Sequence, residues 1–128
     1  MNIFGVGVDL VKSSRIKKIL LSSYSERFLH KVLHPKEITE LKDKGDIDQQ
    51  THYLASRWCF KEACVKASGR TDLIFPQMYF EKELTGKPIP VFIGFNKDVL
   101  EKELQIKATH ASISHEDDTS IAFVIMSK

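Results

Sequence analysis

The stretch that most constrains the fold is residues 50–69, QTHYLASRWCFKEACVKASG. Good helix formers, the absence of proline and a closing Gly69 predict a single helix of about five turns. One face of this helix carries an apolar stripe: Tyr53, Phe60, Cys64 and Ala67. A stripe of this kind must pack on a core. We therefore expect a central helix around which the rest of the chain folds.

The opposite face of the predicted helix holds the first candidate site. Glu62 and Lys66 emerge there from mostly apolar neighbours: Ala55, Trp58, Cys59 and Val65. A solvated Glu–Lys pair one turn apart stabilises a helix by only about 0.2–0.5 kcal/mol. Charges among apolar neighbours need a partner or a chemical role. A separate polar flank is expected from Arg57, Lys61 and Ser68.

Length and composition predict one globular domain, residues 1–128, with 42% apolar and 28% charged residues. The net charge of +2 does not indicate nucleic-acid binding. Cys59 and Cys64 project to different faces of one helix, which predicts reduced core thiols of an intracellular protein. No apolar run approaches the roughly 20 residues that span a bilayer. The run 3–11 also lacks a basic leader, so we expect a soluble, cytoplasmic protein.

The N-terminal run 3–11 predicts a buried strand, in which Gly5 and Gly7 permit close backbone approach. Asp9 near its end is either a cap for the next helix or a metal ligand. Short helices are then expected from Ser13 or Ser14 as cap to about residue 21, over 24–33, and over 35–44.

The second half of the chain reads mostly as strands. We expect strands at 78–84 and 89–93 around a turn at 85–88, then a helix 96–104 capped by Asn96. Residues 107–115 and 119–126 predict a closing antiparallel hairpin. Asp48 is a plausible cap for the central helix. This order predicts an α+β fold, with helices packed on a mostly antiparallel sheet.

Carboxylates and basic side chains together suggest a site for chemistry on phosphate groups. Asp9 and Glu62 are isolated acids, and Mg²⁺ takes one or two protein carboxylates and completes its shell with water and phosphate oxygens. Arg57, Lys61 and Lys66 could neutralise further phosphate charge. No GxxxxGK[ST] loop and no Ser/His/Asp pattern is present. The residues therefore predict Mg²⁺-assisted chemistry on a phosphate ester or anhydride.

The two predicted helices after the first strand have basic faces, formed by Arg15, Lys18, Arg27 and Lys31. Two such faces in succession indicate an acidic macromolecular partner.

Five blocks of the sequence stand out: GVGVDLVKSSRI, RFLHKVL followed by Pro35 and Glu37, SRWCFKEACVKASG, GKP and SISHEDDTSIAFVI. Together they resemble the holo-acyl-carrier-protein synthases, the bacterial-type 4′-phosphopantetheinyl transferase family. They appear in the family's order and spacing and cover the chain nearly end to end. The segment 69–83 matches least.

The resemblance implies transfer of the 4′-phosphopantetheine arm of coenzyme A to a serine of an apo acyl carrier protein, a step of fatty acid biosynthesis. It releases adenosine 3′,5′-bisphosphate. Asp9 and Glu62 would hold Mg²⁺, Lys66 would steady the phosphate, and the base would be Glu62 or a metal-bound water. The implied coenzyme A contacts are Arg57, Lys61, Lys66, Gly86, Lys87, Pro88, Ser114 and His115. The implied carrier contacts are Arg15, Lys18, Arg27, Phe28 and Lys31.

The resemblance further implies a homotrimer with active sites between subunits, and no nucleic-acid or membrane partner. Two other functions compete with it. A Mg²⁺-dependent phosphodiesterase or nuclease shares the paired acids but usually needs more carboxylates for two metals. A non-catalytic basic adaptor that binds RNA or an acidic protein shares the basic surface. The spacing of the Phe and Tyr residues, however, predicts that they are buried in the core, which leaves no exposed aromatic side chains on which bases could stack.

Overall fold

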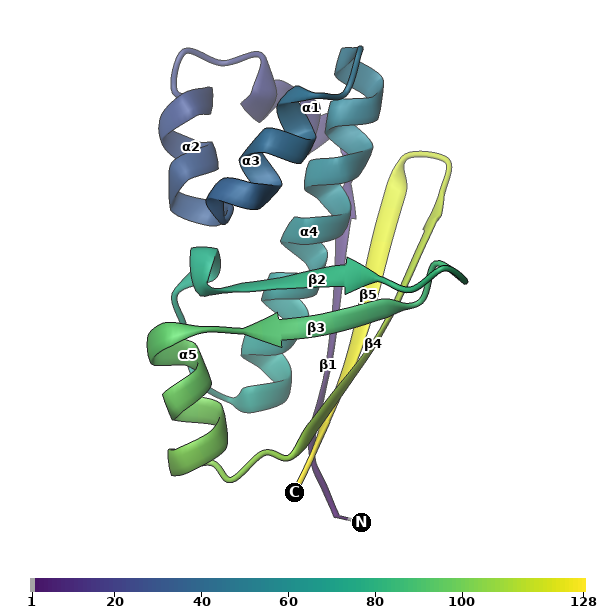
Figure 1. The fold of residues 1–128 in the computed structure, drawn as a ribbon. Coiled ribbons are helices and arrows are strands. Elements are labelled where there is room, and N and C mark those ends of the chain that lie inside the picture. Colours follow the sequence, from purple (N-terminus) through teal and green to yellow (C-terminus); the bar gives the residue numbers. More distant parts are fainter. Residues whose placement is uncertain (1) are drawn as a thin grey trace.

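The fold is organised around one long helix lying on a three-stranded sheet (Figure 1). The computed structural model describes residues 2–128. Helix α4 (Ile47–Ser68) packs on a sheet with the order β1 (Ile3–Lys12), β5 (Thr119–Ser127), β4 (Ala108–Glu116). Both strand pairs are antiparallel. The predicted α+β class and the predicted C-terminal hairpin are therefore confirmed.

The remaining elements surround α4. Three short helices gather at its N-terminal end (Figure 1): α1 (Ser13–Leu20), α2 (Ser25–Val32) and α3 (Pro35–Lys42). A second, two-stranded sheet crosses α4 and is flanked by short helical turns: η1 (Phe75–Gln77), β2 (Met78–Lys82), β3 (Pro88–Phe92), α5 (Gly94–Asp98) and η2 (Val99–Glu103). At the far end of the molecule the backbone N–H of Lys128 donates to the carbonyl of Asn2 at 2.8 Å.

The two glycines of β1 set its distance from α4. A Cβ added at Gly5 would lie 2.0 Å from the carbonyl oxygen of Ala67, and one at Gly7 would lie 2.0 Å from that of Ala63. No side chain fits in either gap, so the helix backbone rests directly on the strand. The close approach expected from these glycines is confirmed.

Helix α4 begins earlier than the sequence suggested. Its N-cap is Asp46, whose carboxylate accepts from the N–H of Gln49 at 2.8 Å. Asp48, the expected cap, lies inside the helix and pairs with Lys17 of α1 at 3.3 Å. The helix ends as predicted at Gly69, which adopts φ +70°. Among residues 2–128 no helix has the length and apolarity needed to cross a membrane.

The polar flank expected on α4 does not exist, because Arg57, Lys61 and Ser68 are all buried. The guanidinium carbon of Arg57 lies 3.8 Å from the ring centre of Tyr53 and 4.3 Å from that of Phe80. An arginine held between two rings gains cation–π attraction and hides its stem from water. This residue therefore belongs to the packing of β2 on α4.

Lys61 is fully buried, at 0% exposure, and its charge is compensated inside the core. The ammonium lies 2.6 Å from Glu37 Oε1 and donates to the carbonyls of Val32 at 2.6 Å and Phe75 at 3.1 Å. Burial lowers the pKa of Lys61, and the Glu37 charge opposes that effect. This one ammonium joins the end of α2, the start of α3 and the η1 segment to α4.

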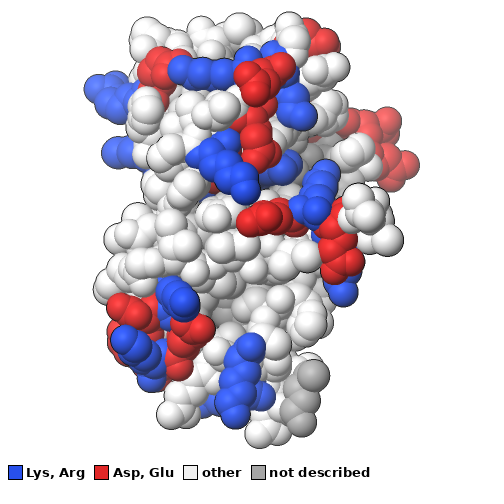
Figure 2. Space-filling view, viewed as in Figure 1, with Lys and Arg blue, Asp and Glu red and all other residues white. Residues whose placement is uncertain are grey.

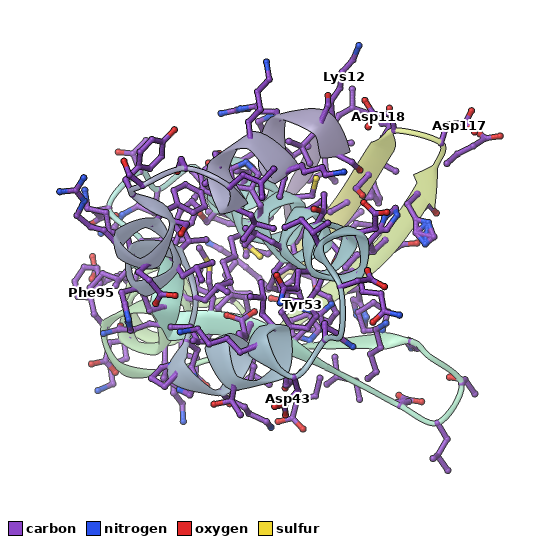
Figure 3. All side chains as sticks on the ribbon, turned by 90° about the horizontal axis from the view of Figure 1, so that it is seen from above. Lys12, Asp43, Tyr53, Phe95, Asp117 and Asp118 are labelled. Carbon is purple, nitrogen blue, oxygen red and sulfur yellow. The ribbon has the colours of Figure 1, made fainter. Side chains whose placement is uncertain are left out.

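Two other expected caps do not cap their helices. The N–H groups of Ser13 and Ser14 donate to Asp118 at 2.8 and 3.1 Å, so α1 is capped by the β4–β5 turn and not by its own serines. Figure 3 labels Asp118 at that turn, close to the start of α1. Asn96 lies within α5, fully buried, and its amide pairs with both the N–H and the carbonyl of Ile74.

Strand β1 is buried on one face only, which corrects the expectation of a fully buried strand. The side chains that point away from α4 are large, apolar and exposed: Ile3, Val6, Val8, Leu10 and, on β5, Phe123. We call these five residues the open face. Val8 and Phe123 lie directly opposite each other across the strand pair. A contiguous apolar surface of this kind marks a site that something else covers.

Candidate active site

The junction of β1 and α4 brings the predicted acid pair together with a lysine. Lys66 donates from its ammonium to Asp9 Oδ1 at 3.1 Å and to the carbonyl of Val8 at 3.0 Å. Asp9 is on the strand face that meets α4, and its side chain is 16% exposed. It does not cap α1. Of the two roles left open for Asp9, the structure leaves it available as a ligand.

Glu62 lies close enough to Asp9 and Lys66 for their charges to act on it. Burial raises the pKa of Glu62 and the negative charge of Asp9 raises it further, while Lys66 and Arg15 act in the opposite direction. Within residues 2–128, Glu62 forms no ion pair. Two carboxylates that repel each other therefore lie at one junction, with Lys66 and Arg15 as the nearby positive groups.

A pair of carboxylates at one junction suits a hard divalent cation. No group of three or more His, Cys, Asp or Glu side chains in residues 2–128 is placed to hold a metal. Asp9 and Glu62 would therefore share an ion with water and phosphate oxygens, which is the usual coordination of Mg²⁺ in phosphoryl-transfer sites. The donor set thus fits the magnesium that the sequence predicts.

A second feature of the site is a basic cavity of about 580 Å³ between α4, β2 and β4. It gathers four of the predicted coenzyme contacts: Arg57, Gly86, Pro88 and His115. Three further basic residues line it that sequence reasoning missed: Lys44, His52 and Lys82. No acidic side chain lines the cavity. Five basic groups around one hollow favour the approach of an anion.

Arg57 lies against the rings of Tyr53 and Phe80 at the wall of this basic cavity. Its Nη1 donates to Ser56 Oγ at 3.0 Å, while its buried Nε has no hydrogen-bond partner among residues 2–128. The Tyr53 ring beneath it is fixed by a hydrogen bond from its hydroxyl to Glu40 at 3.1 Å. A guanidinium held in one orientation, with one nitrogen left without a hydrogen-bond partner, is suited to a phosphate group.

Four predicted coenzyme contacts lie outside the basic cavity, and one of them, Lys66, lies at the β1–α4 junction described above. The Lys61 ammonium is enclosed in the core, out of reach of a ligand. Ser114 pairs with Ile121 on the sheet face opposite His115, because successive strand residues alternate. Lys87 is exposed and is absent from the cavity lining.

The predicted carrier-facing residues lie on α1 and α2. Arg15, Lys18, Arg27 and Lys31 are all exposed, and none forms an ion pair within residues 2–128. Phe28 lies beside Trp58, with ring centres 5.6 Å apart, and Trp58 lies equally far from Phe75. In the view of Figure 2, blue and red side chains are interspersed, so this face presents no uniform basic field for nucleic acid.

Sequence patterns could not reveal every member of these groups. Lys44, His52 and Lys82 belong to no motif, and they come from three separate segments: the loop before α4, α4 itself and β2. Trp58 could have been suspected as a site residue, since it is a large aromatic residue one turn before Glu62. The same position is equally typical of a residue buried in the core.

A small α+β domain with an acid pair, a neighbouring lysine and a separate basic cavity is the arrangement expected of an enzyme that acts on a phosphate ester or anhydride. The comparisons identify which enzymes these are. A family model described as the 4′-phosphopantetheinyl transferase superfamily matches residues 5–124. The chain therefore belongs to this superfamily, as its sequence blocks predicted.

Relatives named holo-[acyl-carrier-protein] synthase match over nearly their whole length. The protein of Halothermothrix orenii is 38% identical over 123 residues, covering 94% of both chains. A Buchnera aphidicola protein is 37% identical over 131 residues, covering 98% of both. These matches mark the chain as a phosphopantetheinyl transferase.

Solved structures agree in fold. The holo-ACP synthase of Plasmodium yoelii superposes with a TM-score of 0.86 at 30% identity, covering 98% of this chain and 94% of that one. The Neisseria meningitidis synthase gives 0.85 at 31%, covering 98% and 99%. The Helicobacter pylori synthase, solved in complex with coenzyme A, gives 0.78 at 29%, covering 95% and 99%.

Proposed function

We propose that Asp9, Glu62 and Lys66 carry out the family's reaction with Mg²⁺: transfer of the 4′-phosphopantetheine arm of coenzyme A to a serine of apo acyl carrier protein. The serine hydroxyl gives its proton to a base, either Glu62 or a water molecule, and its oxygen forms a bond to the phosphorus that bears the arm. The bond from that phosphorus to the bridging oxygen breaks, and adenosine 3′,5′-bisphosphate leaves. The observation that supports this proposal best is the meeting of both acids and the lysine at the β1–α4 junction.

Each member of this trio has a role that follows from its charge. Asp9 and Glu62 are the residues that would hold Mg²⁺, which supplies charge neutralisation to the pyrophosphate when bound. Lys66 brings an ammonium to the same junction, where it can stabilise negative charge on the transferred phosphoryl group. Positioning and electrostatics account for most of phosphoryl-transfer catalysis, and these three groups supply both.

The basic cavity is the proposed binding site for the nucleotide end of coenzyme A. Its support is the set of five basic groups, the unpaired Nε of Arg57, and the likeness to a Helicobacter pylori structure titled as a coenzyme A complex. Arg57 and His115 are the contacts we expect to matter most, since they project into the cavity from two different elements.

The carrier protein is proposed to dock on α1 and α2. Four exposed basic residues without ion pairs are available there for an acidic helix: Arg15, Lys18, Arg27 and Lys31. Beside them, Phe28 and Trp58 offer an aromatic surface for apolar side chains of the same partner.

A homotrimer is the proposed assembly. The open face defined above leaves Leu10 at 63%, Val8 at 48% and Phe123 at 42% exposure, an apolar surface that neighbouring copies would cover. Glu62 and Arg57 are five positions apart on α4, so they point to different sides of the helix and serve different surfaces of one chain. Sharing the site between subunits would bring the acid pair of one chain to the basic cavity of another.

Subunit complementation tests the shared site. An Asp9→Asn chain mixed with a His115→Gln chain should recover part of the activity that each lacks, while light scattering reports the mass of the assembly. A fully active monomer would contradict both the trimer and the shared site.

The transfer assay tests the function itself. The protein is incubated with coenzyme A, Mg²⁺ and a panel of apo acyl carrier proteins, and the carrier is read by intact mass. We expect the mass of the phosphopantetheine arm to be added to a carrier, and the addition to stop with EDTA. An adaptor would modify none of the carriers, and a phosphodiesterase would cleave coenzyme A with no carrier present.

The cytoplasm is the proposed location. Cys59 and Cys64 are both free and buried, which suits a compartment that keeps thiols reduced.

A further inference from the structure

Helix α1 has no cap of its own. Its N-cap position is Lys12, whose side chain contains no acceptor and forms no capping hydrogen bond. The first turn contains no acidic residue and one arginine, Arg15. Because the N-terminal end of a helix dipole is positive, it opposes both of these basic groups. A helix of eight residues is also marginal in isolation. The start of α1 therefore depends on a group from elsewhere in the fold.

Asp118, at the turn between β4 and β5, supplies that group. Its carbonyl accepts from the N–H of Ser13 at 2.8 Å, and its carboxylate accepts from the N–H and the hydroxyl of Ser14, both at 3.1 Å. Figure 3 labels Lys12 and Asp118 where β1 passes into α1. The Asp118 carboxylate forms no ion pair within residues 2–128, so Arg15 is not engaged by it. One residue thus satisfies two of the N–H groups that every helix start leaves open.

The turn that carries Asp118 is held in place on both sides without its side chain. Glu116 and Thr119 pair across the hairpin, and Thr119 also pairs with Lys12 of β1. Helix α1 itself is anchored further along by Ile16, which is 1% exposed. Loss of the Asp118 carboxylate would therefore leave the hairpin in position and α1 on the core, and would loosen only the first turn of α1.

That first turn carries a residue on which docking is proposed to depend. Arg15 is exposed there, and Lys18 is exposed about one turn further along α1. Arg15 also lies close enough to Glu62 for its charge to act on the acid pair. Binding to a partner costs less entropy when the backbone beneath a long side chain is already ordered. The cap of α1 therefore bears on how well these basic side chains are prepared for a partner.

We propose that Asp118 is a positioning residue for the carrier protein: by capping α1 from the β4–β5 turn, it holds Arg15 and Lys18 in the orientation that the acidic helix of the carrier meets. The inference rests on the proposed function, because it uses the proposed docking of the carrier on α1 and α2. It gives a role in carrier recognition to a residue that lies outside both docking helices and in a different part of the chain.

Steady-state kinetics measures this effect. Transfer rates of the full chain are measured with an apo acyl carrier protein that the wild-type protein modifies, varying first the carrier and then coenzyme A, with Mg²⁺ present. Asp118→Ala should raise the carrier KM about fivefold, which is the usual loss from a missing helix cap expressed as a binding ratio. The KM for coenzyme A and kcat should change less than about twofold, since the hairpin and the β1–α4 junction keep their other contacts.

Two matched variants separate the capping hydrogen bonds from the charge. Asp118→Asn removes the charge but keeps an oxygen that can accept from the Ser14 N–H, and Asn caps helices about as well as Asp. Its carrier KM should stay within about twofold of the wild-type value. Glu116→Ala removes a negative charge from an exposed position on the same hairpin and should leave the carrier KM unchanged. An Asp118→Asn protein that behaves like Asp118→Ala would overturn the capping role.

A double-mutant cycle tests whether Asp118 acts through the basic face of α1. In a chain that carries Arg15→Gln and Lys18→Gln, the side chains that Asp118 would position are absent. Asp118→Ala should then cause no further rise in the carrier KM. The same fivefold rise in both backgrounds would show a general structural effect and would overturn the inference. Thermal unfolding checks that every variant is folded at the assay temperature.

Failure of this inference is distinguishable from failure of the proposed function. Wild-type protein that modifies a carrier, while Asp118→Ala keeps the wild-type carrier KM, retains the proposed function and overturns the role of Asp118. A carrier KM that Arg15→Gln with Lys18→Gln leaves unchanged overturns docking on α1 together with this inference, while the transfer reaction stands. Wild-type protein that modifies no carrier overturns the proposed function.

Discussion

At the scale of single residues, Asp9 and Glu62 decide whether the proposed chemistry is possible. Asp9→Asn and Glu62→Gln each remove one negative charge from the group that would hold Mg²⁺. We expect either change to lower kcat/KM for transfer by at least about 100-fold, with the fold intact. Asp98→Asn makes the same change at an exposed position on α5 and should have no effect. Near-normal transfer by either site variant would contradict the metal assignment.

The buried Lys61–Glu37 pair allows a second prediction at this scale. Lys61→Met strands the Glu37 carboxylate in the core and should lower the free energy of unfolding by about 3–5 kcal/mol. Glu37→Leu strands the ammonium at comparable cost. The double variant leaves neither charge unpaired and should be more stable than the sum of the two single losses implies. Urea denaturation of all four proteins measures the coupling, and additive losses would show that the two charges act independently.

At the scale of elements, helix α2 carries the test of carrier docking. Arg27→Glu together with Lys31→Glu should raise the KM for the carrier by about tenfold, because the docking face would then repel an acidic helix. Coenzyme affinity should stay unchanged. Lys97→Glu with Lys107→Glu reverses as much charge away from α2 and serves as the control. A carrier KM that ignores both the reversal and added salt would remove α2 from the docking surface.

The elements show which structural features can be predicted from sequence. The α4 helix, its stop at Gly69 and the close approach of β1 follow from local signals: helix formers, a C-terminal glycine and two glycines in a strand. The acid pair could be foreseen as well. Those signals lie within a few residues of the feature that they predict.

The predictions that proved wrong share a different cause: each concerns a residue whose partner is distant in sequence. From the sequence alone Lys61 is predicted to be a surface residue, because its partners Glu37 and the Phe75 carbonyl become its neighbours only in the folded chain. The cap of α1 comes from Asp118, more than 100 residues away from Ser14. The basic cavity needed β2 to cross α4, and no motif records a crossing. Long-range polar partners are therefore what local sequence patterns cannot supply.

At the scale of the whole molecule, the buried thiols predict how stability responds to alkali. Burial raises the pKa of the Cys64 thiol, so the unfolded chain loses that proton at a lower pH than the folded one. The free energy of unfolding should therefore fall as pH rises above about 9. In that range, the free energy of unfolding of the wild-type protein should fall by about 1.4 kcal/mol more per pH unit than that of Cys64→Ala. Denaturation at pH 8, 9 and 10 measures the difference, and parallel pH curves would contradict it.

The contact between Lys128 and Asn2 means that the fold is nearly a closed loop. Because the two ends already meet, a short bridge could join them and the chain could be opened elsewhere without disturbing the packing around α4. The turn between β2 and β3 is a suitable place to open it, since Leu84 there is fully exposed and touches no core residue. A circular permutant opened at that turn would keep β1, α4 and the β4–β5 hairpin in one uninterrupted order. It would also place both new ends beside the basic cavity, where an attached reporter could sense what enters.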